Sequence, residues 1–114
     1  MTEPRDAAVV VFVTGPDLST LQGIACEVVG EHLAACANLI DGVTSIYRWQ
    51  GAVHEDSEAL AMLKTTRSRI PALRKRIEAL HPYDVPEFLA LPVEFGLPAY
   101  LSWLAESVRE EPAS

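Results

Sequence analysis

The stretch from Cys36 to Trp49 is the feature that most constrains this fold. As a single β-strand, its roughly 14 residues would extend for about 46 Å, at ~3.3 Å per residue. A compact domain of 114 residues has a radius of gyration of only about 13 Å. The strand must therefore bend, or project beyond its own domain with Tyr47 and Trp49. Because an unpaired strand edge is a template for pairing, we expect this segment to pack against another copy of the chain.

The residues before this stretch predict a buried strand followed by a helix. Residues 7–14 form a short, β-branched apolar run that ends at Gly15. Asp17 then offers an N-cap oxygen, and apolar residues recur at helical spacing after it. The long strand is expected to begin at about Cys36.

The second half of the chain predicts a return strand, a helix, a further strand and a last helix. Gln50-Gly51 indicates a turn, and Asp41-Gly42 indicates a bulge or bend in the long strand. The elements expected after the turn are a return strand at about 53–66, a helix from Ser68 and Pro71 to His81, a buried strand at 88–93 and a helix opened by Pro98.

This order is βαββαβ with a C-terminal helix, which predicts an α+β fold of the ferredoxin-like type. The chain is expected to be one domain, residues 1–114, with frayed tails at 1–6 and 110–114. In this fold the helices cover one face of an antiparallel sheet. The other face would be rich in apolar residues here, which again predicts a partner surface.

Composition excludes several function classes. The net charge of −7 argues against binding to nucleic-acid backbones. No apolar run approaches the 18 residues of a membrane span, and the acidic N-terminus does not resemble a signal peptide. The two cysteines, Cys26 and Cys36, are not paired as CxxC and suit a reducing cytoplasm. From the cysteines and the N-terminus we expect a cytoplasmic protein. The common nucleophile, nucleotide and zinc motifs are absent, so we expect that it is not an enzyme.

Two groups of residues are candidates for binding. The loop from His81 to Glu87 contains two prolines, and imidazole and carboxylate suit a divalent metal such as Cu²⁺ or Zn²⁺. The alternative is that the loop is structural. Six of the nine basic residues also cluster between Lys64 and Arg76. This cluster would either attract an anion or form a solvated helix face that balances acids on a neighbouring chain.

Short segments along nearly the whole chain, from Val9 to Val108, match a known family in order and spacing. These segments are 13–17 (VTGPD), 33–40 (LAACANLI), 42–49 (GVTSIYRW) with Gly51, 63–65 (LKT), 81–83 (HPY), 85–87 (VPE) and 100–103 (YLSW). On these residues the chain resembles the CutA divalent-cation-tolerance proteins.

The resemblance implies a tight homotrimer of ferredoxin-like subunits, in which long hairpins extend each sheet into the neighbouring subunit. It also implies a shape similar to the PII signalling proteins, with ligand-sized clefts between subunits. Family copper binding is ascribed to a first-strand cysteine and to a histidine and a glutamate that correspond to His81 and Glu87. Val13 occupies the place of that cysteine. We therefore expect no required cofactor and only weak binding of Cu(II) or another divalent metal, with Cu(I) disfavoured.

Three functions follow from these observations. The first is a cytoplasmic trimeric binding protein in divalent-metal tolerance. The second is a PII-like sensor that holds a small anionic ligand or nucleotide in the cleft between subunits. The third is a structural or anchoring trimer. We expect the indole of Trp49 to be buried between subunits and that of Trp103 to belong to the terminal helix of one subunit.

Overall fold

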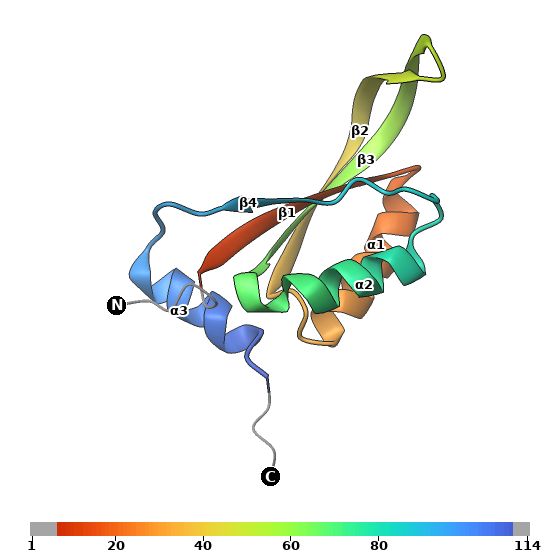
Figure 1. Ribbon diagram of the computed structural model, residues 1–114. Coiled ribbons are helices and arrows are strands. Elements are labelled where there is room, and N and C mark those ends of the chain that lie inside the picture. Colours follow the sequence, from red (N-terminus) through yellow and green to blue (C-terminus); the bar gives the residue numbers. More distant parts are fainter. Residues whose placement is uncertain (1–6, 111–114) are drawn as a thin grey trace.

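A computed structural model describes residues 7–110 of the chain (Figure 1). The elements in chain order are β1 (Ala8–Gly15), α1 (Leu18–Gly30), β2 (Cys36–Trp49), β3 (Ala52–Thr66), the short 3-10 turn η2 (Arg67–Arg69), α2 (Ile70–Leu80), β4 (Leu89–Pro92) and α3 (Pro98–Ser107). The strands form one antiparallel sheet in the order β2-β3-β1-β4. This topology confirms the predicted ferredoxin-like α+β fold.

The core lies between the sheet and the helices α1 and α2, which cover one face of the sheet (Figure 1). Alternate residues of β1, such as Val11 and Val13, are at most 1% exposed because successive strand residues point to opposite faces. Leu21 of α1 and Ile77 of α2 pack against them within the same cluster. Each such side chain contributes about 1.5–3 kcal/mol when fully buried. The N-cap prediction for α1 is confirmed, since Asp17 Oδ1 accepts a hydrogen bond of 2.7 Å from Thr20 N.

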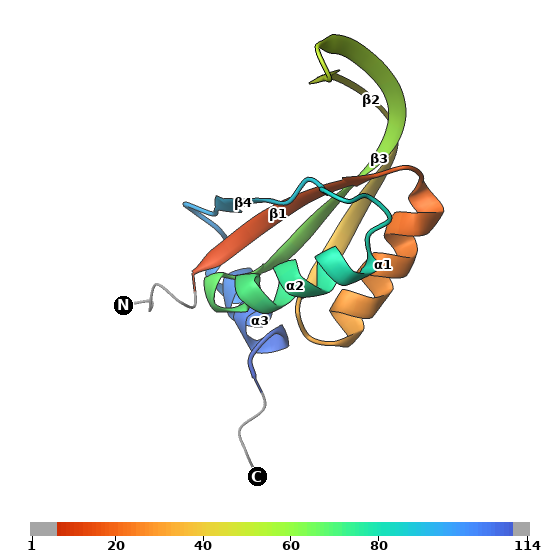
Figure 2. The same ribbon diagram turned by 45° about the vertical axis from the view of Figure 1, so that its right-hand side comes forward.

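The hairpin of β2 and β3 both projects and bends. β1 pairs only with the part of β3 from Ala59 to Thr66, so the distal part of the hairpin has no third strand. Figure 2 shows this distal part curving away from the body of the molecule. The radius of gyration is 15.1 Å and the molecule extends over 49 × 30 × 23 Å. The long strand of the sequence therefore produces an elongated subunit.

The predicted bulge and turn are both confirmed. The register of β2 against β3 shifts between Ile40 and Val43, and Gly42 adopts a φ of +69° there. The side chain of Asp41 stabilises this irregularity by accepting a hydrogen bond of 2.8 Å from Gly42 N. At the tip, Gln50 and Gly51 have φ values of 49° and 78°. Two successive positive values are typical of the type I′ hairpin turn.

Helix α3 covers one end of the opposite, open face of the sheet. Cys36 and Lys64 are directly paired across β2 and β3. The hydroxyl of Tyr100 lies 3.6 Å from Cys36 Sγ, and the Lys64 ammonium lies 5.8 Å from the centre of the Tyr100 ring. The rest of this face retains exposed apolar side chains such as Ile40, which is 45% exposed. Within the described residues, no helix is both long and apolar enough to cross a membrane.

Two details differ from the sequence predictions, and the tails expected at 1–6 and 110–114 are described only at Glu110. The strand expected to be buried at 88–93 is β4, a shorter edge strand whose Leu89 and Leu91 are 57% and 44% exposed. It is exposed because it pairs only with β1 and its apolar residues lie on the open face. The second helix begins at Ile70 rather than Ser68, since a 3-10 turn precedes it. The expected tails at 1–6 and 111–114 lie outside the described residues, whereas Glu110 is described and accepts a hydrogen bond from Arg69.

Candidate functional site

The loop between α2 and β4 carries both residues that the sequence singled out as metal ligands. Helix α2 ends at His81 because Pro82 follows it and drives His81 into an extended conformation, with φ −78° and ψ 139°. The loop then passes along the end of β1 to Glu87, stiffened by Pro82 and Pro86. The sequence thus places an imidazole at a fixed position beside the sheet.

The side chain of His81 is held by two hydrogen bonds and is only 7% exposed. Its Nδ1 accepts a hydrogen bond of 3.1 Å from the backbone N–H of Tyr83. Its Nε2 lies 2.7 Å from the carbonyl oxygen of Thr14. Because a backbone N–H can only donate and a carbonyl can only accept, the ring is neutral and carries its proton on Nε2. Both nitrogens of His81 are therefore already engaged within the chain.

Tyr83 connects this loop to the base of the hairpin. Its ring packs against His81 at 4.7 Å between centroids, and its hydroxyl donates a hydrogen bond of 2.7 Å to Glu58 Oε2. Burial first, and then the bond to Glu58, raise the pKa of Tyr83 above its usual value. In the same region Tyr47 donates a hydrogen bond to Asp56, which raises the pKa of Tyr47. Two phenols and their carboxylate partners thus line the junction of hairpin and loop.

Glu87 lies in the same electrostatic neighbourhood. Burial raises its pKa, and the negative charge of Glu58 raises it further. Within residues 7–110, however, no three His, Cys, Asp or Glu side chains are close enough together to hold a metal ion. Val13, at the position that corresponds to the family's thiol, is 1% exposed and belongs to the core. Within the described residues, His81 and Glu87 therefore belong to no group of three ligand-type side chains that could hold a metal ion.

Sequence reasoning assigned no role to Glu58 or Tyr83, and it placed Tyr47 only on the projecting strand. Tyr83 stands inside the HPY segment, but its partner Glu58 is 25 positions away. The contact depends on where the bulge places the hairpin relative to the loop. The only signal in the sequence is the recurrence of tyrosine and acidic residues in the two segments.

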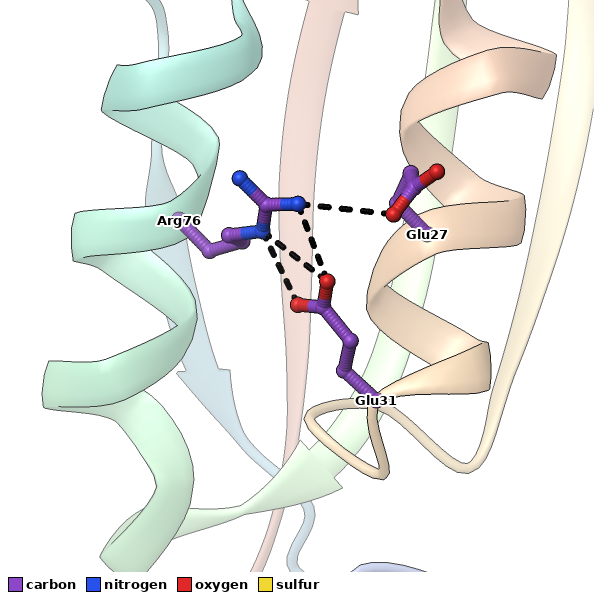
Figure 3. Close-up of polar contacts among 3 residues, drawn as sticks. All are labelled: Glu27, Glu31 and Arg76. Carbon is purple, nitrogen blue, oxygen red and sulfur yellow. Dashed lines mark hydrogen bonds and ion pairs between the residues drawn. The ribbon is translucent and has the colours of Figure 1, made fainter.

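Three of the six residues of the basic cluster form ion pairs within the described part of the chain. Figure 3 shows Arg76 of α2 facing Glu27 of α1 and Glu31, which directly follows α1. Its Nε and Nη2 each lie 2.9 Å from an oxygen of Glu31, and Nη2 also lies 3.4 Å from Glu27. Arg74 pairs with Glu78, and Arg69 with Glu110. The acids that balance these three arginines belong to the same chain, so the expectation that a neighbouring chain supplies them is wrong for these residues.

Comparisons with known proteins agree with the resemblance. The family described as CutA1 divalent ion tolerance protein matches residues 9–107. A divalent-cation tolerance protein CutA from Thermus thermophilus is 51% identical over 98 residues, covering 86% of this chain and 95% of the relative. The solved structure of a divalent cation tolerance protein, Cut A1, also from Thermus thermophilus, is similar with a TM-score of 0.88, at 49% identity over 90% of this chain and 99% of the other. A structure described as the periplasmic divalent cation tolerance protein CutA from Archaeoglobus fulgidus gives a TM-score of 0.86, at 29% identity over 90% and 99% of the two chains.

Proposed function

This chain belongs to the CutA1 divalent ion tolerance protein family, and from that membership we propose that it is a homotrimeric binding protein acting in tolerance of divalent metal ions. The observation that carries the proposal is the family match over residues 9–107, which spans every described helix and strand except the first residue of β1. We infer that the protein acts by binding rather than by catalysis. We also propose the cytoplasm as its compartment, and recovery in a periplasmic fraction would contradict this assignment.

The projecting hairpin supports self-association. Beyond the bulge it exposes Ile46 and Val53, each at 66%, and Trp49 at 57%. Exposure of these apolar side chains to water is unfavourable, and a ribbon of two strands is only marginally stable by itself. A neighbouring copy would cover these side chains and supply a third strand. We propose that three copies exchange hairpins in this way, in the arrangement that the family resemblance implies.

We propose His81 and Glu87 as the protein ligands of a weakly bound Cu²⁺ or related divalent ion. A metal at Nδ1 of His81 must displace the N–H of Tyr83, and leaving that donor unpaired costs about 1–3 kcal/mol. This cost corresponds to a loss of about fivefold to 150-fold in affinity. Water or a neighbouring subunit would complete the coordination sphere. Affinity should then be modest and greater for Cu²⁺ than for Zn²⁺.

Calorimetric titration of the tag-free protein with Cu²⁺ and Zn²⁺ tests this assignment. We expect His81→Ala to lose the specific Cu²⁺ heat, and the matched variant His54→Ala to retain it, since His54 is exposed and lies in the hairpin. Glu87→Gln should weaken binding without removing the hydrogen bonds of His81. Binding should also weaken as the pH falls, because protons compete with the metal ion for the imidazole nitrogen.

The same titration can overturn the metal assignment. If His81→Ala and Glu87→Gln bind Cu²⁺ as well as the parent does, this loop is not the metal site. The sensor for anionic ligands at the subunit cleft and the structural trimer would then become the leading functions. A thermal-shift screen with nucleotides separates these two, because a ligand that binds the folded state raises its melting temperature.

A further inference from the structure

A pocket of about 460 Å³ lies between the turn that follows β3 and the end of α3. Thr66, Ser68 and Arg69 line one side, and Ser102, Glu106 and Glu110 belong to the other. Thr66 pairs with Ala8 at the start of β1, whereas His81 contacts Thr14 near its end. At ~3.3 Å per residue these positions are on the order of 20 Å apart. The pocket is therefore separate from the His81 loop, and a ligand in it would be independent of metal binding at that loop.

Arg69 is the buried charge of this pocket. Its side chain is 14% exposed, and its Nη1 donates a hydrogen bond of 2.8 Å to Glu110 Oε1. Its Nε is closed to solvent and has no hydrogen-bond partner among the described residues. An unpaired buried donor costs about 1–3 kcal/mol, and more when it belongs to a charged group. Arg69 is thus only partly paired within the described residues, and the Nη1 group that contacts Glu110 is the donor that a ligand could engage.

The chain itself shows what such an arginine can bind. Arg76 uses its Nε and Nη2 to hold both oxygens of the Glu31 carboxylate at 2.9 Å each. Carboxylate and phosphate groups have the geometry that an arginine engages with two parallel N–H donors. In Arg69 the hydrogen bond found among the described residues joins Nη1 to the carboxylate of Glu110. An oxyanion in the pocket would take the place of that carboxylate.

The hydroxyl groups of the lining suit an oxyanion ligand, and the carboxylate of Glu106 is paired with Arg109 at 3.0 Å. The hydroxyls of Thr66 and Ser68 lie 3.1 Å apart beside Arg69, and Ser102 adds a third hydroxyl. The carboxylate of Glu110 is on a side chain that is 73% exposed. An ion pair with an exposed partner is worth only about 0–1 kcal/mol, so a ligand can displace it. A volume near 460 Å³ is also within the range of small-molecule sites, about 300–1,000 Å³.

We propose that this pocket binds a small molecule through a phosphate or carboxylate group held by Arg69, and that Glu110 occupies Arg69 when the ligand is absent. A ligand oxygen takes the place of the Glu110 carboxylate at Nη1 of Arg69, and the hydroxyls of Ser68 and Ser102 donate to it. Glu110 is an internal competitor in this arrangement. Removing its charge should therefore tighten binding, which is the opposite of what loss of a structural ion pair would do.

The test follows the side-chain Nε–H signals of arginine by ¹⁵N NMR in the full chain. Sodium phosphate and sodium succinate are added separately at constant ionic strength, with sodium chloride as the control. We expect a saturable shift of the Arg69 signal, which is assigned by its loss in Arg69→Lys. Glu110→Gln should bind at least severalfold more tightly. Arg74→Gln is the matched control and should bind as the parent does, since Arg74 is exposed and pairs with Glu78 outside the pocket.

The two titrations distinguish the chemical classes of ligand. Saturation with phosphate alone identifies a phosphoryl ligand, saturation with succinate alone identifies a carboxylate ligand, and saturation with both identifies a general oxyanion site. A shift that chloride reproduces, or that does not saturate, overturns the proposal. So does an affinity that Glu110→Gln leaves unchanged or weakens. This last comparison remains decisive if Arg69→Lys does not fold, because Glu110 lies at the exposed end of the described chain.

Discussion

The hydroxyl of Tyr83 donates a hydrogen bond of 2.7 Å to the carboxylate of Glu58, and this contact fastens the loop after α2 to the hairpin at its bulge. Glu58 pairs with Val43, the first residue of β2 after the register shift. The contact therefore lies where the hairpin leaves the sheet. It links the direction of the hairpin to the loop that carries His81 and Glu87.

Replacing Tyr83 by phenylalanine should lower the free energy of unfolding by about 1 kcal/mol at neutral pH, because a hydrogen bond to a charged acceptor is lost at a partly exposed site. Urea unfolding of parent and variant measures the difference. Glu58→Gln is the companion variant, since it keeps an acceptor but removes the charge. It should lose less stability than Tyr83→Phe, and the reverse order would show that the contact is not the source of the effect.

The raised pKa of Tyr83 also predicts a dependence on pH. The folded state holds the phenol proton more tightly than the unfolded chain, whose tyrosine titrates near pH 10. The stabilisation is thus fully present below about pH 10 and is lost as the pH rises above that value. We expect the stability gap between the parent and Tyr83→Phe to shrink between about pH 10 and 11. A gap that is constant over this range would contradict the shift.

The hairpin shows how far sequence reasoning reaches. Length alone predicted a strand that bends or projects, and Asp41-Gly42 marked the bulge because few other residue pairs tolerate that conformation. These signals are local. The contact of Tyr83 with Glu58 is not local, since it depends on how far the bulge rotates the hairpin. No periodicity in the sequence carries that information.

The prediction that the strand at 88–93 is buried was wrong for a related reason. An apolar run of this length is typical of a buried strand, and Leu89 and Leu91 are indeed apolar. Within one chain, however, they lie on the open face, where only β1 adjoins them. Apolar residues in a sequence indicate burial in whatever assembly the chain forms. They do not indicate which chain supplies the cover.

The ion pairs of Arg76 should contribute to the packing of α1 against α2. Arg76→Met should lower the melting temperature at low salt and neutral pH, because Glu27 and Glu31 lose their shared cation. The bond to Arg76 lowers the pKa of Glu31, so this contribution is present above about pH 4.3 and is lost as the pH falls below it. Arg74→Met is the control and should have the smaller effect. Equal losses for both variants, or no response to salt, would rule out a specific role for Arg76.

The exposed hairpin predicts an obligate oligomer. Multi-angle light scattering at low micromolar concentration should give three times the chain mass of 12.4 kDa. The hairpin and the open sheet face leave too much apolar surface for a stable monomer. A monomer peak with native circular dichroism would contradict the proposed assembly.

Trp49 and Trp103 should differ in their contributions to this oligomer. In one chain they are similarly exposed, at 57% and 47%. Trp103 already packs against Tyr100 of its own helix, at 5.4 Å between ring centroids. Trp49 lies at the end of the projecting strand, so we expect its indole to be buried by a neighbour. Trp49→Ala should weaken the trimer and lower its melting temperature more than Trp103→Ala does, measured at matched concentrations. Dissociation by Trp103→Ala alone would assign the interface to α3.

Placing a thiol at Val13 tests the metal assignment by adding a ligand, whereas His81→Ala removes one. Val13 is 1% exposed, and the carbonyl of the next residue, Thr14, accepts the hydrogen bond of His81. Val13→Cys therefore places a soft ligand one residue before the carbonyl group that holds His81. The change removes little volume, so the stability cost should be about 0.5–1.5 kcal/mol.

We expect Val13→Cys to tighten metal binding, most of all for Cu(I), because thiolate is the ligand that Cu(I) prefers. Competition with a chromophoric Cu(I) chelator measures the gain. Val11→Cys is the matched control, since Val11 is equally buried on the same face of β1 but two residues further from Thr14. It should show the stability cost without the gain in affinity. Combining Val13→Cys with His81→Ala should remove the gain, because a single thiolate does not form the site. If Val11→Cys tightens Cu(I) binding as much as Val13→Cys does, the gain comes from any buried thiol and the site does not include His81.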